Sequence, residues 1–209
     1  MATSLLLWLS TLGLLLALAL LVGRIVTGDW RGILVDTRNK LSIARLQLLL
    51  WTAFVLSAYL AAALANVAAG TPDPLGISVP EGLWAALGVS TASLAAAPYV
   101  LSRQPGKLAT NATPVRASWR DLVTDEVDGF DHLVDLGKLQ MVLVTGVLLV
   151  AYAVAFADRL ESGPAAVRSL PAVNGAFVIL LGISHAGYLA KKRAPRAGAA
   201  RSGAASSRA

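Results

Sequence analysis

The sequence has no cysteine, only two histidines and few charged residues, since Asp, Glu, Lys and Arg make up 14% of its 209 residues. Without cysteine the chain can form no disulfide bond and no thiolate-based catalytic or metal site. The two histidines, His132 and His185, are too few for the common catalytic zinc centres. An ordinary soluble domain has about 25% charged residues, whereas 56% of this chain is apolar. This composition excludes a typical soluble protein and favours a helical membrane protein.

Five apolar runs are long enough to cross a hydrocarbon core of about 30 Å as helices that rise 1.5 Å per residue. None of them contains Asp, Glu, Lys or Arg, and they cover residues 4–22, 46–65, 83–101, 139–157 and 173–190. The first run is interpreted as a retained span and not as a cleaved signal peptide, because residues 1–4 carry no cation. We therefore expect an all-α membrane protein with five transmembrane helices.

The orientation follows from the cations, because short cytoplasmic loops carry the excess of Lys and Arg. The first loop, the third loop and the C-terminal tail are rich in cations, whereas residues 66–82 have none and the fourth loop has only Arg159 and Arg168. This pattern predicts that the N-terminus lies outside and the C-terminus in the cytoplasm. The net charge of +6 is thus a topological signal, and we expect no nucleic-acid partner.

The second and third spans resemble the fourth and fifth. Identical or similar residues recur about 93 positions apart, as in Arg45 and Lys138, Gln47 and Gln140, Thr52 and Thr145, and Tyr59 and Tyr152. The chain is expected to divide into one leading helix (1–23), a basic loop (24–45), a first two-helix repeat unit (46–101), a third loop (102–138), a second unit in the same orientation (139–190) and a disordered basic tail (191–209).

Three segments carry a resemblance to a known family. They are Ile33-Leu34-Val35-Asp36-Thr37-Arg38-Asn39-Lys40, which leads into Arg45-Leu46-Gln47 and Trp51-Thr52, then Asp135-Leu136-Gly137-Lys138-Leu139-Gln140, and Leu181-Gly182-Ile183-Ser184-His185-Ala186-Gly187-Tyr188-Leu189. Over roughly residues 30–190 the chain resembles an uncharacterised group of bacterial multipass membrane proteins. The resemblance implies a bacterial inner (plasma) membrane location and the same helical layout. It implies no activity and no site residues.

A polar stripe follows the first helix of each repeat unit, because the cation, the threonine and the tyrosine stand seven residues apart, nearly two helical turns. Its members are Arg45, Gln47, Thr52 and Tyr59 in one unit and Lys138, Gln140, Thr145 and Tyr152 in the other. The stripe either lines a path between the units or supplies hydrogen bonds between helices. The glutamines are expected to pair between the units or between chains. His185, six residues before Lys191, is either a solvated or hydrogen-bonded interfacial histidine or a proton-relay or pH-sensitive switch.

The third loop contains an acidic, amphipathic segment. Ser118 and Asp121 predict a capped short helix, with Trp119, Leu122, Val123 and Val127 on one apolar face. Six acids follow without a cation, namely Asp121, Asp125, Glu126, Asp128, Asp131 and Asp135. We expect them to dock onto the basic first loop, the tail or a cytoplasmic protein. A divalent-cation site and simple solvation are the alternatives.

No paired carboxylates, nucleophile with its base, or metal-ligand cluster is visible, so the sequence predicts neither an enzyme nor a cofactor. The first functional hypothesis is a structural, assembly or anchoring component of the membrane, homo-oligomeric, with a cytoplasmic docking surface that includes Trp119 and the six acids. The alternative is a small oligomeric channel or transporter with its path between the two repeat units.

Overall fold

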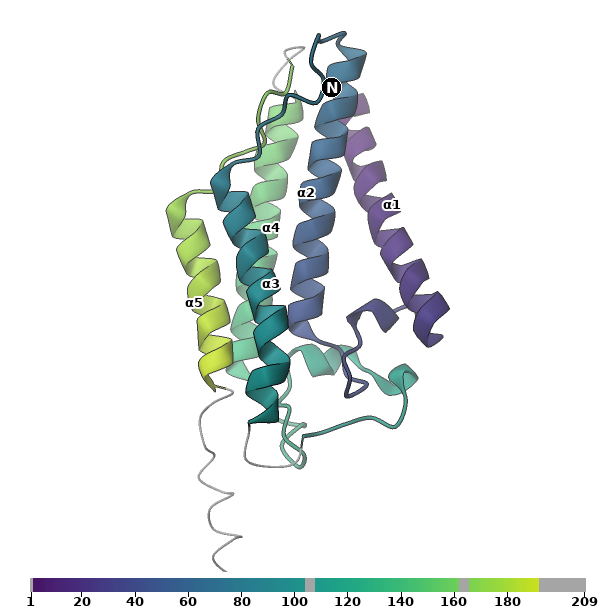
Figure 1. Ribbon diagram of the computed structural model, residues 1–209, viewed down its shortest axis with the longest axis vertical. Coiled ribbons are helices and arrows are strands. Elements are labelled where there is room, and N and C mark those ends of the chain that lie inside the picture. The colour runs from purple at the N-terminus through teal and green to yellow at the C-terminus, as the bar shows by residue number, and fades with distance from the viewer. Residues whose placement is uncertain (1, 104–107, 162–165, 192–209) are drawn as a thin grey trace, which may run out of the picture.

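The computed structural model describes residues 2–103, 108–161 and 166–191, and it is built from helices (Figure 1). Five α-helices are present in the described residues: α1 (Ala2–Thr27), α2 (Ile43–Ala68), α3 (Glu81–Ser102), α4 (Leu136–Glu161) and α5 (Gly175–Lys191). Three short 3₁₀ turns, η1 (Gly32–Leu34), η2 (Pro114–Arg116) and η3 (Trp119–Leu122), lie in the first and third loops. The predicted all-α class is confirmed. The predicted tail beyond residue 191 lies outside the described residues.

Four helices, α1 to α4, are long and apolar enough to cross a membrane. The fifth span stays a prediction, because α5 has 17 residues, at the lower end of the length that crosses a membrane. It begins at Gly175 and not at residue 173, because the Asn174 side chain accepts a hydrogen bond from Phe177 N and caps the helix there. The chain is a multipass membrane protein with four candidate spans.

The helices form two antiparallel hairpins that lie against each other, with one further helix outside (Figure 1). Helices α2 and α3 form the first hairpin, and α4 and α5 form the second. The hairpins meet through α2 with α4 and through α3 with α5, while α1 packs mainly on α2. The loops before α2 and before α4 hang from one end of the bundle, and the N-terminus lies at the other (Figure 1).

The aromatic residue Trp8 holds α1 to this bundle. Its ring packs edge-on against Phe54 of α2 and Phe156 of α4, with centroids 5.8 and 5.0 Å away. The indole also donates a 3.2 Å hydrogen bond to Ser57 Oγ. Because the indole N–H is paired inside the bundle, the buried ring leaves no orphan donor in the membrane.

The two connections at the opposite end pair with each other through Asn66, which is 1% exposed. Its amide donates to the carbonyls of Pro74 and Val167, and its oxygen accepts from Val167 N at 2.7 Å. Ser78 and Leu170 continue the pairing with backbone hydrogen bonds. These bonds hold residues 166–174 extended beside the other connection until Gly175, where α5 begins.

Candidate functional site

The first and third loops fold together into one body beneath the helices. We call this body the cap and define it as residues 28–42 and 108–135. Asn39 and Asn111 exchange side-chain hydrogen bonds with each other's carbonyls, at 2.9 and 2.8 Å, and Asn111 N donates to Arg38 O. Asn39 has a φ of 58°, a left-handed conformation that asparagine tolerates better than most residues. The Arg31 guanidinium adds a 2.8 Å bond to Ala117 O.

A buried chain of ion pairs runs through the cap into α4. Arg38 pairs with Asp36 at 2.7 Å and with Glu126 at 3.2 Å, and Lys138 Nζ pairs with Glu126 at 3.2 Å. Lys138 also donates to Asp121 O at 2.8 Å. Burial by itself lowers the pKa of Arg38, but the carboxylates of Glu126 and Asp36 outweigh it and raise that pKa above its ordinary value. Both loops are therefore fastened to the start of α4 by compensated buried charges.

Asp121 joins the first loop to the short turn η3. Its carboxylate accepts hydrogen bonds from Leu41 N at 3.2 Å and Ser118 N at 2.8 Å, and Lys40 Nζ lies 3.5 Å away. Ser118 caps the turn, so the capping box expected from the sequence is confirmed. The helix stops at Leu122, however, so Val127 does not share a helical face with Trp119.

Most of the predicted acidic surface lies inside the protein. Of the six acids, Asp121, Asp125, Glu126 and Asp135 are each 5–7% exposed. Asp135 accepts from Gly137 N and Lys138 N at the start of α4. Asp131 lies 3.6 Å from Lys40, and Asp128 is exposed. Trp119, 58% exposed, remains on the surface as expected for a docking residue.

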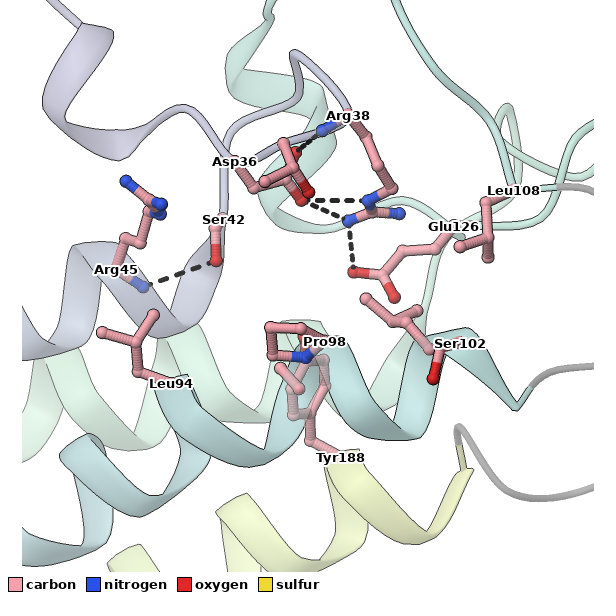
Figure 2. Close-up of a pocket in the computed structure, with 13 residues that line it drawn as sticks. Asp36, Arg38, Ser42, Arg45, Leu94, Pro98, Ser102, Leu108, Glu126 and Tyr188 are labelled. Carbon is pink, nitrogen blue, oxygen red and sulfur yellow. Dashed lines mark hydrogen bonds and ion pairs between the residues drawn. The ribbon is translucent and has the colours of Figure 1, made fainter.

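A partly open pocket of about 270 Å³ separates the cap from α3 (Figure 2). We call it the junction pocket. Leu94, Ala97, Pro98 and Leu101 of α3 supply an apolar wall, and Arg38, Ser42 and Arg45 supply polar groups opposite. Tyr188 of α5 also lines it. Asp36 and Glu126 also line the pocket and pair with Arg38. The pocket can therefore hold a small group that is anionic near Arg45 and apolar towards α3.

Arg45 differs from Arg38, the other cation that lines this pocket. Its backbone N–H is held by Ser42 Oγ, but its half-buried guanidinium forms no ion pair with any carboxylate of the described residues. Figure 2 shows its side chain apart from Arg38 and Glu126, on the far side of Ser42. Sequence reasoning placed Arg45 in the polar stripe and missed this pocket, because the opposite wall comes from α3 and the cap.

The two halves of the predicted polar stripe lie in different surroundings. Gln47 donates from Nε2 to Thr145 Oγ1 and Met141 O across the bundle, which is pairing between the two units. Tyr59 instead donates to Leu75 O at the opposite end, whereas Tyr152 is buried beside Phe54. The remaining members also differ, because Gln140 is exposed, Thr52 half-buried and Lys138 buried. The structure brings together Gln47 and Thr145 and does not gather the other members into one lining.

His185 is buried at 3% exposure and not solvated at the interface. Its Nδ1 shares a hydrogen bond with Ser93 Oγ of α3. With Gln47 and Thr145, these residues place one buried polar side chain on each of the four bundle helices. Two hydrogen-bonded pairs, α2 to α4 and α3 to α5, therefore link the two hairpins within the bundle.

Comparison with known proteins gives no matching family model, no matching curated protein and no matching solved structure. The family resemblance stays a prediction from the sequence, and so do the bacterial membrane, the internal repeat and the oligomeric state. The chain is an all-α, multi-helix membrane protein with four candidate spans.

Proposed function

We propose that the protein is a structural or anchoring component of the membrane, without enzymatic activity of its own, whose cap is a docking surface on the cytoplasmic side. The observation that carries the proposal is the preassembled cap. Its two loops are joined by the buried pairs Arg38–Glu126 and Lys40–Asp121. A surface ordered in advance loses less conformational entropy when a partner binds.

The groups left on the cap surface favour an acidic partner. A hollow of about 330 Å³ is lined by Lys40, Arg116, Arg120, Asp131 and other polar residues. Asp121 and Asp131 already hold Lys40. Arg116 and Arg120 are exposed and form no ion pair within the described part of the chain. Exposed Trp119 lies between these two arginines in sequence, and aromatic residues with arginine are typical of interface centres. An acidic segment of a cytoplasmic protein fits this surface.

The proposal can be tested by photocrosslinking in cells of the native host. A photoreactive residue in place of Trp119 is expected to capture one defined protein through an acidic segment identified by mass spectrometry. The double change Arg116→Glu and Arg120→Glu should reduce that crosslink at least tenfold, because like charges then face the partner. Arg103→Glu, which reverses an exposed positive charge outside the hollow, serves as the matched control and should retain it.

Crosslinks to lipid and to other copies of the chain alone, unchanged by the double charge reversal, would contradict the docking proposal. A crosslink to lipid that the reversal abolishes would also contradict it, because the arginines would then serve the membrane surface.

The alternative of a channel gains no support from the described residues. Of its expected lining, Thr145 is hydrogen-bonded to Gln47, and Tyr152 is packed among aromatic rings. Tyr59 points to the connection at the opposite end, where it binds Leu75 O. A path between the two units stays a prediction, which solute flux into liposomes would test.

A further inference from the structure

Arg45 lines two separate hollows. One is the junction pocket, between the cap and α3. The other, of about 320 Å³, lies between α1 and the first loop, and Arg45, Asp36 and Thr37 line both. We call this second cavity the α1 hollow. An arginine that lines two cavities and has no carboxylate partner in the described part of the chain is a cation available to an external anion.

The location of Arg45 sets the kind of molecule that can reach it. Arg45 lies in the first turn of α2, and Leu101 of the opposite wall lies in the last turn of α3, so the junction pocket lies at the end of two candidate spans. The first turn of α2 adds partial positive charge there. Anions at this depth in a bilayer belong mainly to lipid head groups.

The α1 hollow continues this site along apolar side chains. Val22, Val26 and Ile33 line it, and Val26 is 76% exposed. Figure 1 shows α1 diverging from α2 towards the cap, which is where this hollow lies. The apolar side chains that line the α1 hollow suit a hydrocarbon chain. At about 270 Å³ the junction pocket is below the usual range for drug-sized ligands. That volume suits a head group and not a whole lipid.

We propose that Arg45 binds the phosphate of one anionic glycerophospholipid, with the head group in the junction pocket and an acyl chain in the α1 hollow. The guanidinium presents a planar fork that matches a phosphate. The lipid supplies the anion that no carboxylate of the described ranges supplies to Arg45, and its acyl chain covers the exposed face of Val26. This site is independent of the docking surface around Trp119.

The test is native mass spectrometry of the full chain released from bilayers of phosphatidylglycerol and phosphatidylcholine. The wild type is expected to retain one phosphatidylglycerol per chain in preference to phosphatidylcholine. Arg45→Gln should lower that retention at least tenfold, and Arg45→Lys should keep a part of it, because the charge remains without the fork. Arg103→Gln is the matched control, since Arg103 follows the end of α3 but lines neither hollow.

Unfolding temperatures in detergent separate lost binding from lost folding. Arg45→Gln is expected to unfold near the wild-type temperature without lipid and to lose the stabilisation that phosphatidylglycerol gives the wild type. Equal retention of the two lipids, or equal loss with Arg45→Gln and Arg103→Gln, would overturn the proposal. So would inorganic phosphate stabilising the wild type as well as the lipid does, because the site would then bind a free anion only.

Discussion

A lysine at the start of a membrane helix usually extends its amine into the interface, but Lys138 is 3% exposed and lies inside the protein. Its amine is compensated by Glu126 and by the carbonyl of Asp121. The sequence identified both Lys138 and Glu126 as notable residues. It could not pair them, because a pattern along one chain does not show which groups of the third loop fold back onto α4.

The change Lys138→Met is expected to destabilise the cap by about 3 kcal/mol, the lower end for removing one partner of a buried ion pair, because Arg38 still holds Glu126. Hydrogen exchange at the amides of Asp121 and Val123 measures this loss. The double change Lys138→Met with Glu126→Gln should cost less than the single one. Arg120→Met, on the surface, should stay within about 0.5 kcal/mol of the wild type.

Gln47 and Thr145 allow a test of how the hairpins are joined. Gln47→Leu and Thr145→Val are each expected to lower the free energy of unfolding by about 1 kcal/mol, because each leaves a buried polar group without its partner. The double variant should show a coupling of about 0.6 kcal/mol, which is typical of hydrogen bonds between membrane helices. Unfolding in mixed micelles measures the cycle, and strictly additive losses would show that the bond contributes nothing.

At the scale of elements, the capping signal of the third loop was interpreted correctly, but the length of the helix that follows it was not. Ser118 and Asp121 cap η3 as predicted, because a capping box depends on residues only three positions apart. The expected amphipathic helix beyond Leu122 does not form. There the chain makes backbone bonds with itself, as between Val123 O and Asp135 N, and side-chain periodicity does not reveal such bonds.

The ion pair between Asp29 and Arg31 is sensitive to pH, and Arg31 also bonds to Ala117 O of the third loop. The hydrogen bond from the Arg31 side chain lowers the pKa of Asp29 from 3.8 to about 2, so the pair contributes stability above pH 3.8 and loses it as the pH falls through about 2. We expect the difference in unfolding temperature between the wild type and Asp29→Asn to be full at neutral pH and to vanish across that interval. A difference that does not change with pH would contradict this account.

At the scale of the whole molecule, the sequence predicted the number of helices and all four candidate spans of the structure, because apolar length alone determines them. The fifth helix was overestimated by two residues at its start, where Asn174 caps α5. Docking of the acids onto the basic first loop was one of the alternatives that the sequence left open. In the folded chain Asp121, Glu126 and Asp131 pair with Lys40 and Arg38 of that loop, because burying the apolar groups between the loops brings the opposite charges together.

The orientation of the helices in the membrane is a prediction about the whole molecule. A reporter fused after Gly70 is expected to be external, and one fused after Lys107 cytoplasmic, because cations concentrate in the loops on that side. Paired phosphatase and fluorescent-protein fusions in bacterial cells measure both positions. The reverse pattern would place the cap outside the cell and would rule out a cytoplasmic partner.

The central claim is that the first and third loops form one cap beneath the helices, and the absence of cysteine allows a direct test in intact membranes. Arg38 O and Asn111 N are 3.0 Å apart, so cysteines at the neighbouring positions Thr37 and Ala112 should be joined within one chain by a short bifunctional thiol reagent. Thr37 paired with Thr71, beyond the far end of the 26-residue helix α2, should not react. Efficient joining of Thr37→Cys to Ala112→Cys alone supports the account, and equal joining of both pairs, or of neither, contradicts it.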